Sequence, residues 1–125
     1  MISAELKENL KVCLTNDKHS IMSDVTHSKG GDDTALDPHE LLEASLAACT
    51  SITVTMYAKR KGWNLENVYT IVKITKEGNE NEIERKIDLI GNLDEEQKKR
   101  LLEIANKCPM HIFLEHKTVV HTSLL

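Results

Sequence analysis

The fold is decided by the stretch DPHELLEASLAACTSITVTMYAKRKG, which runs from Asp37 to Gly62 and predicts one long helix. Asp37 can cap the first turn by accepting a backbone N–H, and Pro38 suits the first helical position, where no N–H donor is needed. Three basic residues followed by Gly62 are typical of a helix end. The β-branched run 52–55 by itself favours a strand, but the caps and the length of the apolar segment outweigh it.

Apolar side chains surround this predicted helix on every side between Leu41 and Met56. A helix that is apolar all round in a soluble protein is normally buried. The chain has 125 residues, enough for one hydrophobic core, and only 3% of them are aromatic, so the core must be aliphatic. We therefore expect a single domain, residues 1–125, built around a long buried central helix.

Short segments in which polar and apolar residues alternate predict two β-hairpins. The paired segments are 8–14 with 18–25, and 68–75 with 83–90. Turn-like sequences separate the members of each pair, and a polar loop over 28–34 follows the first hairpin. Two antiparallel hairpins combined with a buried helix indicate an α+β fold in which sheet is wrapped on helix.

The C-terminal third predicts a second helix, a short helical turn and a last strand. Asp94 as N-cap and Gln97 three residues later form a capping box, which predicts a helix to about Lys107. The Cys108-Pro109 pair then predicts a short helical turn. Residues 117–124 complete the chain as a predicted strand.

Composition excludes several classes of function. The formal net charge is −4 and the basic residues are scattered, so there is no basic stripe for nucleic acid. The charged N-terminus is unlike a signal peptide, and no apolar run approaches the roughly 18 residues of a membrane span. Motifs of serine hydrolases, P-loop NTPases and dinucleotide-binding enzymes are absent. We expect a cytoplasmic protein that binds neither nucleic acid nor membrane.

The chemistry of the chain centres on its cysteines, Cys13, Cys49 and Cys108. An odd number of cysteines is not the pattern of a secreted disulfide scaffold. Cys108 precedes Pro109 and is therefore the expected N-cap of a helix, where backbone N–H groups favour a thiolate, with His111 one turn away. The alternative is that each cysteine fills the core, because free cysteine is among the most buried residue types.

Zinc binding is a further alternative for the Cys108 region. Cys108 and His111 form a Cys-x-x-His pair, and His116 and His121 follow. Structural zinc sites usually have two well-spaced pairs of ligands. We therefore expect no metal and no other cofactor.

Four segments together resemble the OsmC/Ohr family. They are Gly30-Gly31, Pro38-His39-Glu40-Leu41-Leu42, Ala47-Ala48-Cys49-Thr50 and Cys108-Pro109. The resemblance spans nearly the whole chain, about residues 8 to 124, with the elements in the right order. Residues 56–63, MYAKRKGW, look most like the YhfA-type branch of OsmC-like proteins.

The resemblance implies both a fold and an activity. The implied fold is an intertwined homodimer with antiparallel sheets wrapped around paired central helices. The implied activity is an antioxidant, stress-response peroxidase that reduces organic hydroperoxides. Cys49 would be the peroxidatic cysteine and would become a sulfenic acid. Cys108 would resolve it as a disulfide, which an external dithiol would reduce.

The family pattern also includes an arginine from the N-terminal strands and a glutamate directly after the proline. The arginines of this chain are Arg60, Arg85 and Arg100, and none of them lies in the first two predicted strands. Lys18 is the nearest basic candidate there. The position after the proline is His39, and Glu40 follows one residue later.

Glu40 is therefore the candidate catalytic carboxylate, with His39, His111 and Lys18 as candidate tuning residues. Ten residues of helix rise roughly 15 Å, so a contact from His39 or Glu40 to Cys49 would have to come from the partner subunit. The alternative function is an OsmC-like dimer with little or no peroxidase activity that binds a small apolar or thiol ligand at the subunit interface.

Overall fold

The computed structural model describes residues 1–125, and the chain divides into two compact units, Met1–Ala44 and Ser45–Leu125. Two separate antiparallel sheets and three α-helices make up the architecture, which confirms the predicted α+β class. Helix α1 (Pro38–Lys61) begins in the first unit and continues through the second. The expectation that residues 1–125 form one domain stays a prediction.

The first unit contains a three-stranded antiparallel sheet with the order β1-β2-β3. Its strands are β1 (Ser3–Leu6), β2 (Val12–Thr15) and β3 (Ser20–Ser23). The β2–β3 pair confirms the first predicted hairpin, with Cys13 opposite Met22. Strand β1 was not predicted. Its residues alternate, with Ala4 and Leu6 next to Ser3 and Glu5, but the segment is only four residues long and all four are exposed.

Buried Asp24 organises the loop that follows β3 and its short 3-10 helix η1 (His27–Lys29). The Asp24 carboxylate accepts hydrogen bonds from the Val25 N–H at 2.8 Å and from the Thr34 hydroxyl at 2.7 Å. The hydrogen bond from Thr34 is the main cause that lowers the pKa of Asp24 to about 2. Gly31 lies in the same loop. The position requires glycine, because a Cβ there would lie 2.0 Å from the Val25 carbonyl oxygen.

Helix α1 begins and ends where the sequence predicts. The Asp37 carboxylate accepts the Glu40 N–H at 2.9 Å and the Glu40 carboxylate accepts the Asp37 N–H at 2.8 Å, which is a reciprocal capping box. Gly62 follows the helix with a φ of +67°, a conformation that glycine adopts without steric cost. The β-branched run 52–55 is helical because tertiary packing around buried Val54 overrides its local preference.

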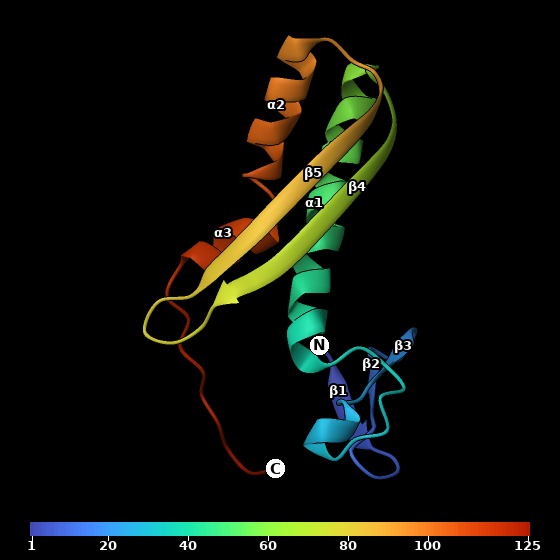
Figure 1. The fold of residues 1–125 in the computed structure, drawn as a ribbon, viewed down its shortest axis with the longest axis vertical. Coiled ribbons are helices and arrows are strands. Elements are labelled where there is room, and N and C mark those ends of the chain that lie inside the picture. The colour runs from blue at the N-terminus through green and yellow to red at the C-terminus, as the bar shows by residue number, and fades with distance from the viewer. The chain divides into compact units, whose positions relative to one another are not determined.

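The second unit packs a long hairpin and two helices against α1 (Figure 1). The hairpin pairs β4 (Asn64–Lys76) with β5 (Glu82–Asn92), and α2 (Glu95–Ala105) and α3 (Pro109–Glu115) follow. The core of this unit is aliphatic, as predicted. It consists of Val54, Ala58, Leu93, Leu101 and Ala105.

Tyr57 lies beside this core and is surrounded by cations. The guanidinium carbons of Arg60 and Arg100 lie 5.4 and 5.5 Å from the centre of its ring, and Trp63 packs edge-on at 5.6 Å. Arg100 Nε donates a hydrogen bond to the Tyr57 hydroxyl oxygen at 3.0 Å. This hydrogen bond lowers the pKa of Tyr57 and ties α2 to α1.

One stripe of α1 is buried and the opposite side is exposed. The buried stripe is Leu46, Thr50, Val54 and Ala58, whereas Ile52 and Met56 are 59% and 66% exposed. In the single chain α1 is therefore covered on one side only.

By length and composition α1 could also cross a membrane, so the expectation that no apolar run reaches that length was too strict. The criterion counts mean hydropathy and allows polar residues such as Ser45, Thr50 and Ser51 between the apolar ones. The core helix of a soluble protein meets the same criterion, and α1 packs a buried stripe against β4, β5 and α2.

The predicted strand over residues 117–124 is wrong. These residues form no helix or strand, and Val119 and Val120 are 65% and 81% exposed. A strand is held by hydrogen bonds to a neighbouring strand, and no strand of either sheet pairs with this segment. A local preference for extended backbone was therefore not sufficient.

Candidate functional site

Cys108 is fully buried at the start of α3. It is the N-cap residue, as predicted, and its Sγ accepts a hydrogen bond from the His111 backbone N–H at 3.3 Å. The next residue, Pro109, occupies the first helical position, where its missing N–H costs nothing. The local sequence thus fixes the direction in which the sulfur points.

Arg85 of β5 brings a positive charge to this sulfur. Its Nη1 lies 4.0 Å from Cys108 Sγ, and the same nitrogen donates to Thr50 Oγ1 at 3.0 Å and to the Ala105 carbonyl oxygen at 3.2 Å. Its Nη2 donates to Asn106 Oδ1 at 2.8 Å. The guanidinium is therefore held by α1 through Thr50 and by the C-terminal end of α2 through Ala105 and Asn106.

No carboxylate pairs with Arg85. The groups that accept its hydrogen bonds are all neutral, whereas Lys86, the next residue of β5, forms an ion pair with Glu84 at 3.3 Å. A half-buried guanidinium without an anionic partner leaves a net positive charge in its surroundings. The Cys108 sulfur lies 4.0 Å from this charge.

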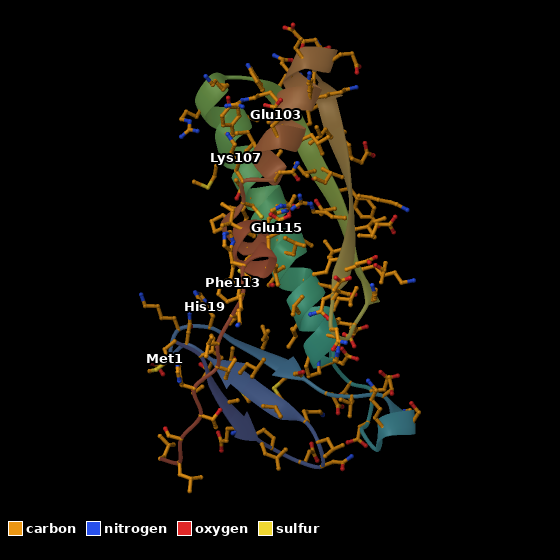
Figure 2. All side chains as sticks on the ribbon, turned by 90° about the vertical axis from the view of Figure 1, so that its left-hand side faces the viewer. Met1, His19, Glu103, Lys107, Phe113 and Glu115 are labelled. Carbon is orange, nitrogen blue, oxygen red and sulfur yellow. The ribbon has the colours of Figure 1, made fainter.

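His111 links this cluster to Glu115. Arg85 Nη2 lies 3.2 Å from His111 Nδ1, and His111 Nε2 lies 3.1 Å from Glu115 Oε1. Because a guanidinium has only donors, the hydrogen-bond network assigns Nδ1 as the acceptor and places the ring hydrogen on Nε2, which donates to Glu115. His111 thus orients the Arg85 fork, and Glu115, on α3 in Figure 2, orients His111.

Thr50 connects Cys108 to the central helix. Thr50 Oγ1 lies 3.9 Å from Cys108 Sγ and donates its own hydrogen to the Leu46 carbonyl oxygen at 2.7 Å. It therefore presents a lone pair to Arg85 and to the sulfur. Cys108 is thus in contact with the turn of α1 that carries Cys49.

Cys49 is half-buried at the boundary between the two sides of α1. It precedes Thr50 in the chain, so its side chain projects about 100° away around the helix. Helical spacing places it on the side of exposed Ile52 and Met56. Both Cys49 and Cys108 are free thiols, and Cys13 is free on β2.

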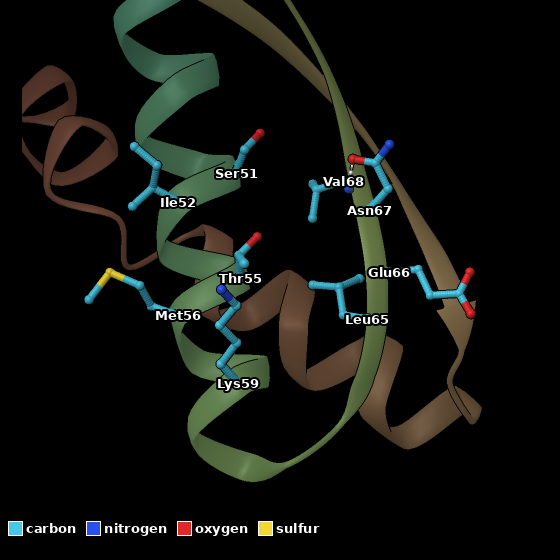
Figure 3. Close-up of a pocket in the computed structure, with 9 residues that line it drawn as sticks. All are labelled: Ser51, Ile52, Thr55, Met56, Lys59, Leu65, Glu66, Asn67 and Val68. Carbon is cyan, nitrogen blue, oxygen red and sulfur yellow. Dashed lines mark hydrogen bonds between the residues drawn. The ribbon is translucent and has the colours of Figure 1, made fainter.

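A hollow of about 460 Å³ opens between α1 and β4 on this side (Figure 3). Its lining is mixed, with four apolar and five polar or charged residues. Its lining residues are Ser51, Ile52, Thr55, Met56, Lys59, Leu65, Glu66, Asn67 and Val68. The hollow begins two residues after Cys49 along α1.

The other predicted site residues lie in the first unit. Glu40 closes the α1 capping box described above and has a structural partner in Asp37. His39 is exposed in the first turn of α1. Lys18 is exposed in the turn between β2 and β3, where its backbone N–H donates to Asn16 Oδ1 at 3.1 Å. Their roles at the reactive sulfurs stay predictions.

Arg85 is the site residue that sequence reasoning missed. The alternation of β5 gives a signal that could have found it, because Ile83, Ile87 and Leu89 face inward and Arg85 occupies an inward position in the same register. A charged residue on the buried side of a strand requires a partner. The structure therefore gathers Cys108, His111 and an arginine that was not expected there.

Comparisons with known proteins agree with this fold. A family model described as OsmC-like protein matches residues 30–123. No curated protein matches the sequence.

Three solved structures are similar. An OsmC-like protein from Mycoplasma pneumoniae is 22% identical with a TM-score of 0.78, covering 92% of this chain and 86% of that one. An organic hydroperoxide resistance protein OsmC from Legionella pneumophila is 19% identical with a TM-score of 0.66, covering 91% and 87%. An organic hydroperoxide resistance protein from Elizabethkingia anophelis, with thiocyanate bound, is 21% identical with a TM-score of 0.68, covering 90% and 86%.

Proposed function

The chain belongs to the OsmC-like family, and on this premise we propose that it reduces organic hydroperoxides with Cys49 as nucleophile and Cys108 as resolving thiol. Two of the similar structures are named for organic hydroperoxide resistance. The observation that carries the proposal is the 3.9 Å contact between Cys108 Sγ and Thr50 Oγ1, because Thr50 directly follows Cys49 on α1.

The proposed reaction has three steps. The Cys49 thiolate attacks the terminal peroxide oxygen, the O–O bond breaks, Cys49 becomes a sulfenic acid, and the alkoxide leaves and takes up a proton from water to become the alcohol. The Cys108 thiolate then attacks Cys49 Sγ, forming the disulfide and expelling hydroxide, which takes up a proton. An external dithiol reduces the disulfide by two successive thiol exchanges and is itself oxidised. The last step needs a pool of reduced dithiol, which the cytoplasm supplies, so the proposal places the protein there.

The working form in this proposal is a homodimer. The exposed side of α1 carries Ile52 and Met56, and a second copy would bury them, as burial of apolar surface favours association. A dimer could also bring Glu40, His39 or Lys18 of the partner subunit to Cys49. Within one chain, Glu40 and His39 lie about ten residues before Cys49 on α1, roughly 15 Å away, and cannot reach it. Light scattering coupled to size exclusion would give twice the 14.1 kDa chain mass if this is correct.

Peroxide turnover tests the activity. With cumene hydroperoxide and a dithiol, the parent protein should consume peroxide, and mass spectrometry should find the Cys49–Cys108 bridge. Cys49→Ser should abolish consumption, and Cys108→Ser should leave Cys49 as a sulfenic acid that a dimedone probe captures. Cys13→Ser is the matched control and should retain the parental rate. The proposal fails if the parent does not consume peroxide, or if Cys49→Ser consumes it at the parental rate.

The hollow beside α1 favours a second candidate function. A small apolar or thiol ligand would fit its walls of Ile52, Met56, Leu65 and Val68, at the side where a second copy would dock. A dimer with little or no peroxidase activity would then serve as a binding protein. A ligand that raises the melting temperature, while cumene hydroperoxide leaves Cys49 reduced, would favour this function over the first.

A further inference from the structure

We propose that Arg85 is the residue that stabilises the Cys108 thiolate, and that His111 and Asn106 are positioning residues that hold the Arg85 guanidinium against the sulfur. The proposal rests on the proposed function, because a thiolate at Cys108 is what the resolving step requires.

The first argument is the fixed position of the guanidinium. Arg85 Nη1 reaches Thr50 Oγ1 at 3.0 Å and the Ala105 carbonyl at 3.2 Å, while Nη2 reaches Asn106 Oδ1 at 2.8 Å and His111 Nδ1 at 3.2 Å. These four acceptors come from α1, from the C-terminal end of α2 and from α3, and together they fix the orientation of the guanidinium. In that orientation Nη1 is 4.0 Å from the fully buried Cys108 sulfur.

The second argument is the charge balance around Cys108. The carboxylate nearest to the cluster, Glu115, bonds to His111 Nε2 and forms no ion pair with Arg85. The charged neighbours of Arg85 on β5, Glu84 and Lys86, pair with each other. An arginine held by neutral groups beside a buried thiol attracts the proton-free form of that thiol.

The charge acts in two steps of the proposed cycle. In resolution, the Cys108 thiolate attacks the sulfur of the Cys49 sulfenic acid, so an S–S bond forms, the S–O bond breaks and hydroxide leaves. In recycling, the thiolate of the external dithiol attacks Cys49 Sγ and breaks the S–S bond, and Cys108 leaves as a thiolate beside Arg85. The first step needs an anionic nucleophile at Cys108 and the second needs an anionic leaving group there.

The reactivity of Cys108 tests the inference without peroxide chemistry. In a Cys13→Ser, Cys49→Ser background, Cys108 is the remaining thiol. Its reaction with the neutral reagent methyl methanethiosulfonate and its ultraviolet thiolate absorbance are measured at neutral pH. Arg85→Met should lower both by about tenfold, the size expected when one charge is lost at 4.0 Å from a partly screened sulfur.

The matched control is Lys86→Met. It removes the same charge from the adjacent residue of the same strand, on the opposite face, and should leave both readings at the parental level. If Arg85→Met matches the parent, or if Lys86→Met lowers the readings equally, the inference is overturned. Arg85→Lys keeps the positive charge but lacks the planar guanidinium, and it should retain part of the Cys108 reactivity and thiolate absorbance. This variant decides whether Arg85 acts on Cys108 if Arg85→Met does not fold.

Variants of His111 test the positioning role. His111→Leu removes the acceptor for Arg85 Nη2 and should lower the Cys108 readings. His111→Asn keeps an acceptor oxygen at a similar reach and should restore them. A purely structural role would give equal readings for the two variants when both are folded, which would overturn the positioning role.

Peroxide experiments with both cysteines present separate this inference from the proposed function. Arg85→Met should form the Cys49 sulfenic acid at the parental rate and close the disulfide about tenfold more slowly. A parent that does not react with peroxide would refute the proposed function, yet the thiolate measurements would still decide whether Arg85 acts on Cys108.

Discussion

Replacing Thr50 by valine tests whether the Arg85 cluster stabilises the fold. Valine has nearly the same shape as threonine but has no hydroxyl. The substitution removes the acceptor that Arg85 Nη1 uses at 3.0 Å and the donor to the Leu46 carbonyl at 2.7 Å. Thr50 is fully buried, so water cannot take the place of the lost oxygen.

The magnitude follows from these contacts. A hydrogen bond from a charged donor contributes about 1.5–3 kcal/mol. The second bond is worth less, because the Leu46 carbonyl keeps its backbone partner within the helix. Burying a methyl group in place of the hydroxyl returns roughly 1 kcal/mol. We expect Thr50→Val to lower the free energy of unfolding by about 1–2 kcal/mol, which corresponds to a fall in melting temperature of about 5 °C.

Urea denaturation and calorimetry measure the effect at one fixed protein concentration, since dimer formation would make stability depend on concentration. Thr53→Val is the matched control, because Thr53 is half-buried on the same helix and makes no hydrogen bond to Arg85. The reasoning is refuted if Thr50→Val is as stable as the parent, or if both variants lose the same free energy.

Three further experiments test the packing of the hydrophobic core around Leu101 and the loop that Asp24 and Gly31 form after β3. Leu101→Ala should cost about 3 kcal/mol because Leu101 is fully buried in the core, whereas Leu102→Ala, at a position 54% exposed, should cost under about 1 kcal/mol in urea denaturation. Gly31→Ala should lower the melting temperature, since its Cβ would lie 2.0 Å from the Val25 carbonyl oxygen; an unchanged value would contradict the loop geometry. The pKa of Asp24 is lowered to about 2 from its usual 3.8, so its charge stabilises the fold above pH 3.8, and this contribution is lost as the pH falls toward 2. Melting temperature should drop over that range more steeply in the parent than in Asp24→Asn, and parallel curves would argue against it.

Local chemistry explains why so much of the fold could be predicted. Asp37 with Glu40, and Asp94 with Gln97, close capping boxes within one helical turn. Cys108 is positioned as an N-cap by the proline that follows it. These features depend on residues three or fewer positions apart, so the sequence contains all the information that they need.

The same reasoning failed where pairing or packing decides the structure. Strand β1 is only four residues long and fully exposed, and what makes it a strand is its pairing with β2, with Glu5 opposite Cys13. Residues 117–124 contain the β-branched pair Val119-Val120 but have no strand beside them. A strand is stabilised by its neighbour, and the neighbour is distant in sequence.

The amino-acid sequence alone determined the caps, the long central helix, the two hairpins over 8–25 and 68–90, and the position of each cysteine on its element. Only the tertiary structure decided which charge meets which sulfur. Arg85 and Cys108 are 23 positions apart, and Thr50 is 58 positions from Cys108. Folding β5, α1 and α3 onto one core brings the three together, because burial of aliphatic side chains, and not any local preference, sets the distance between those elements.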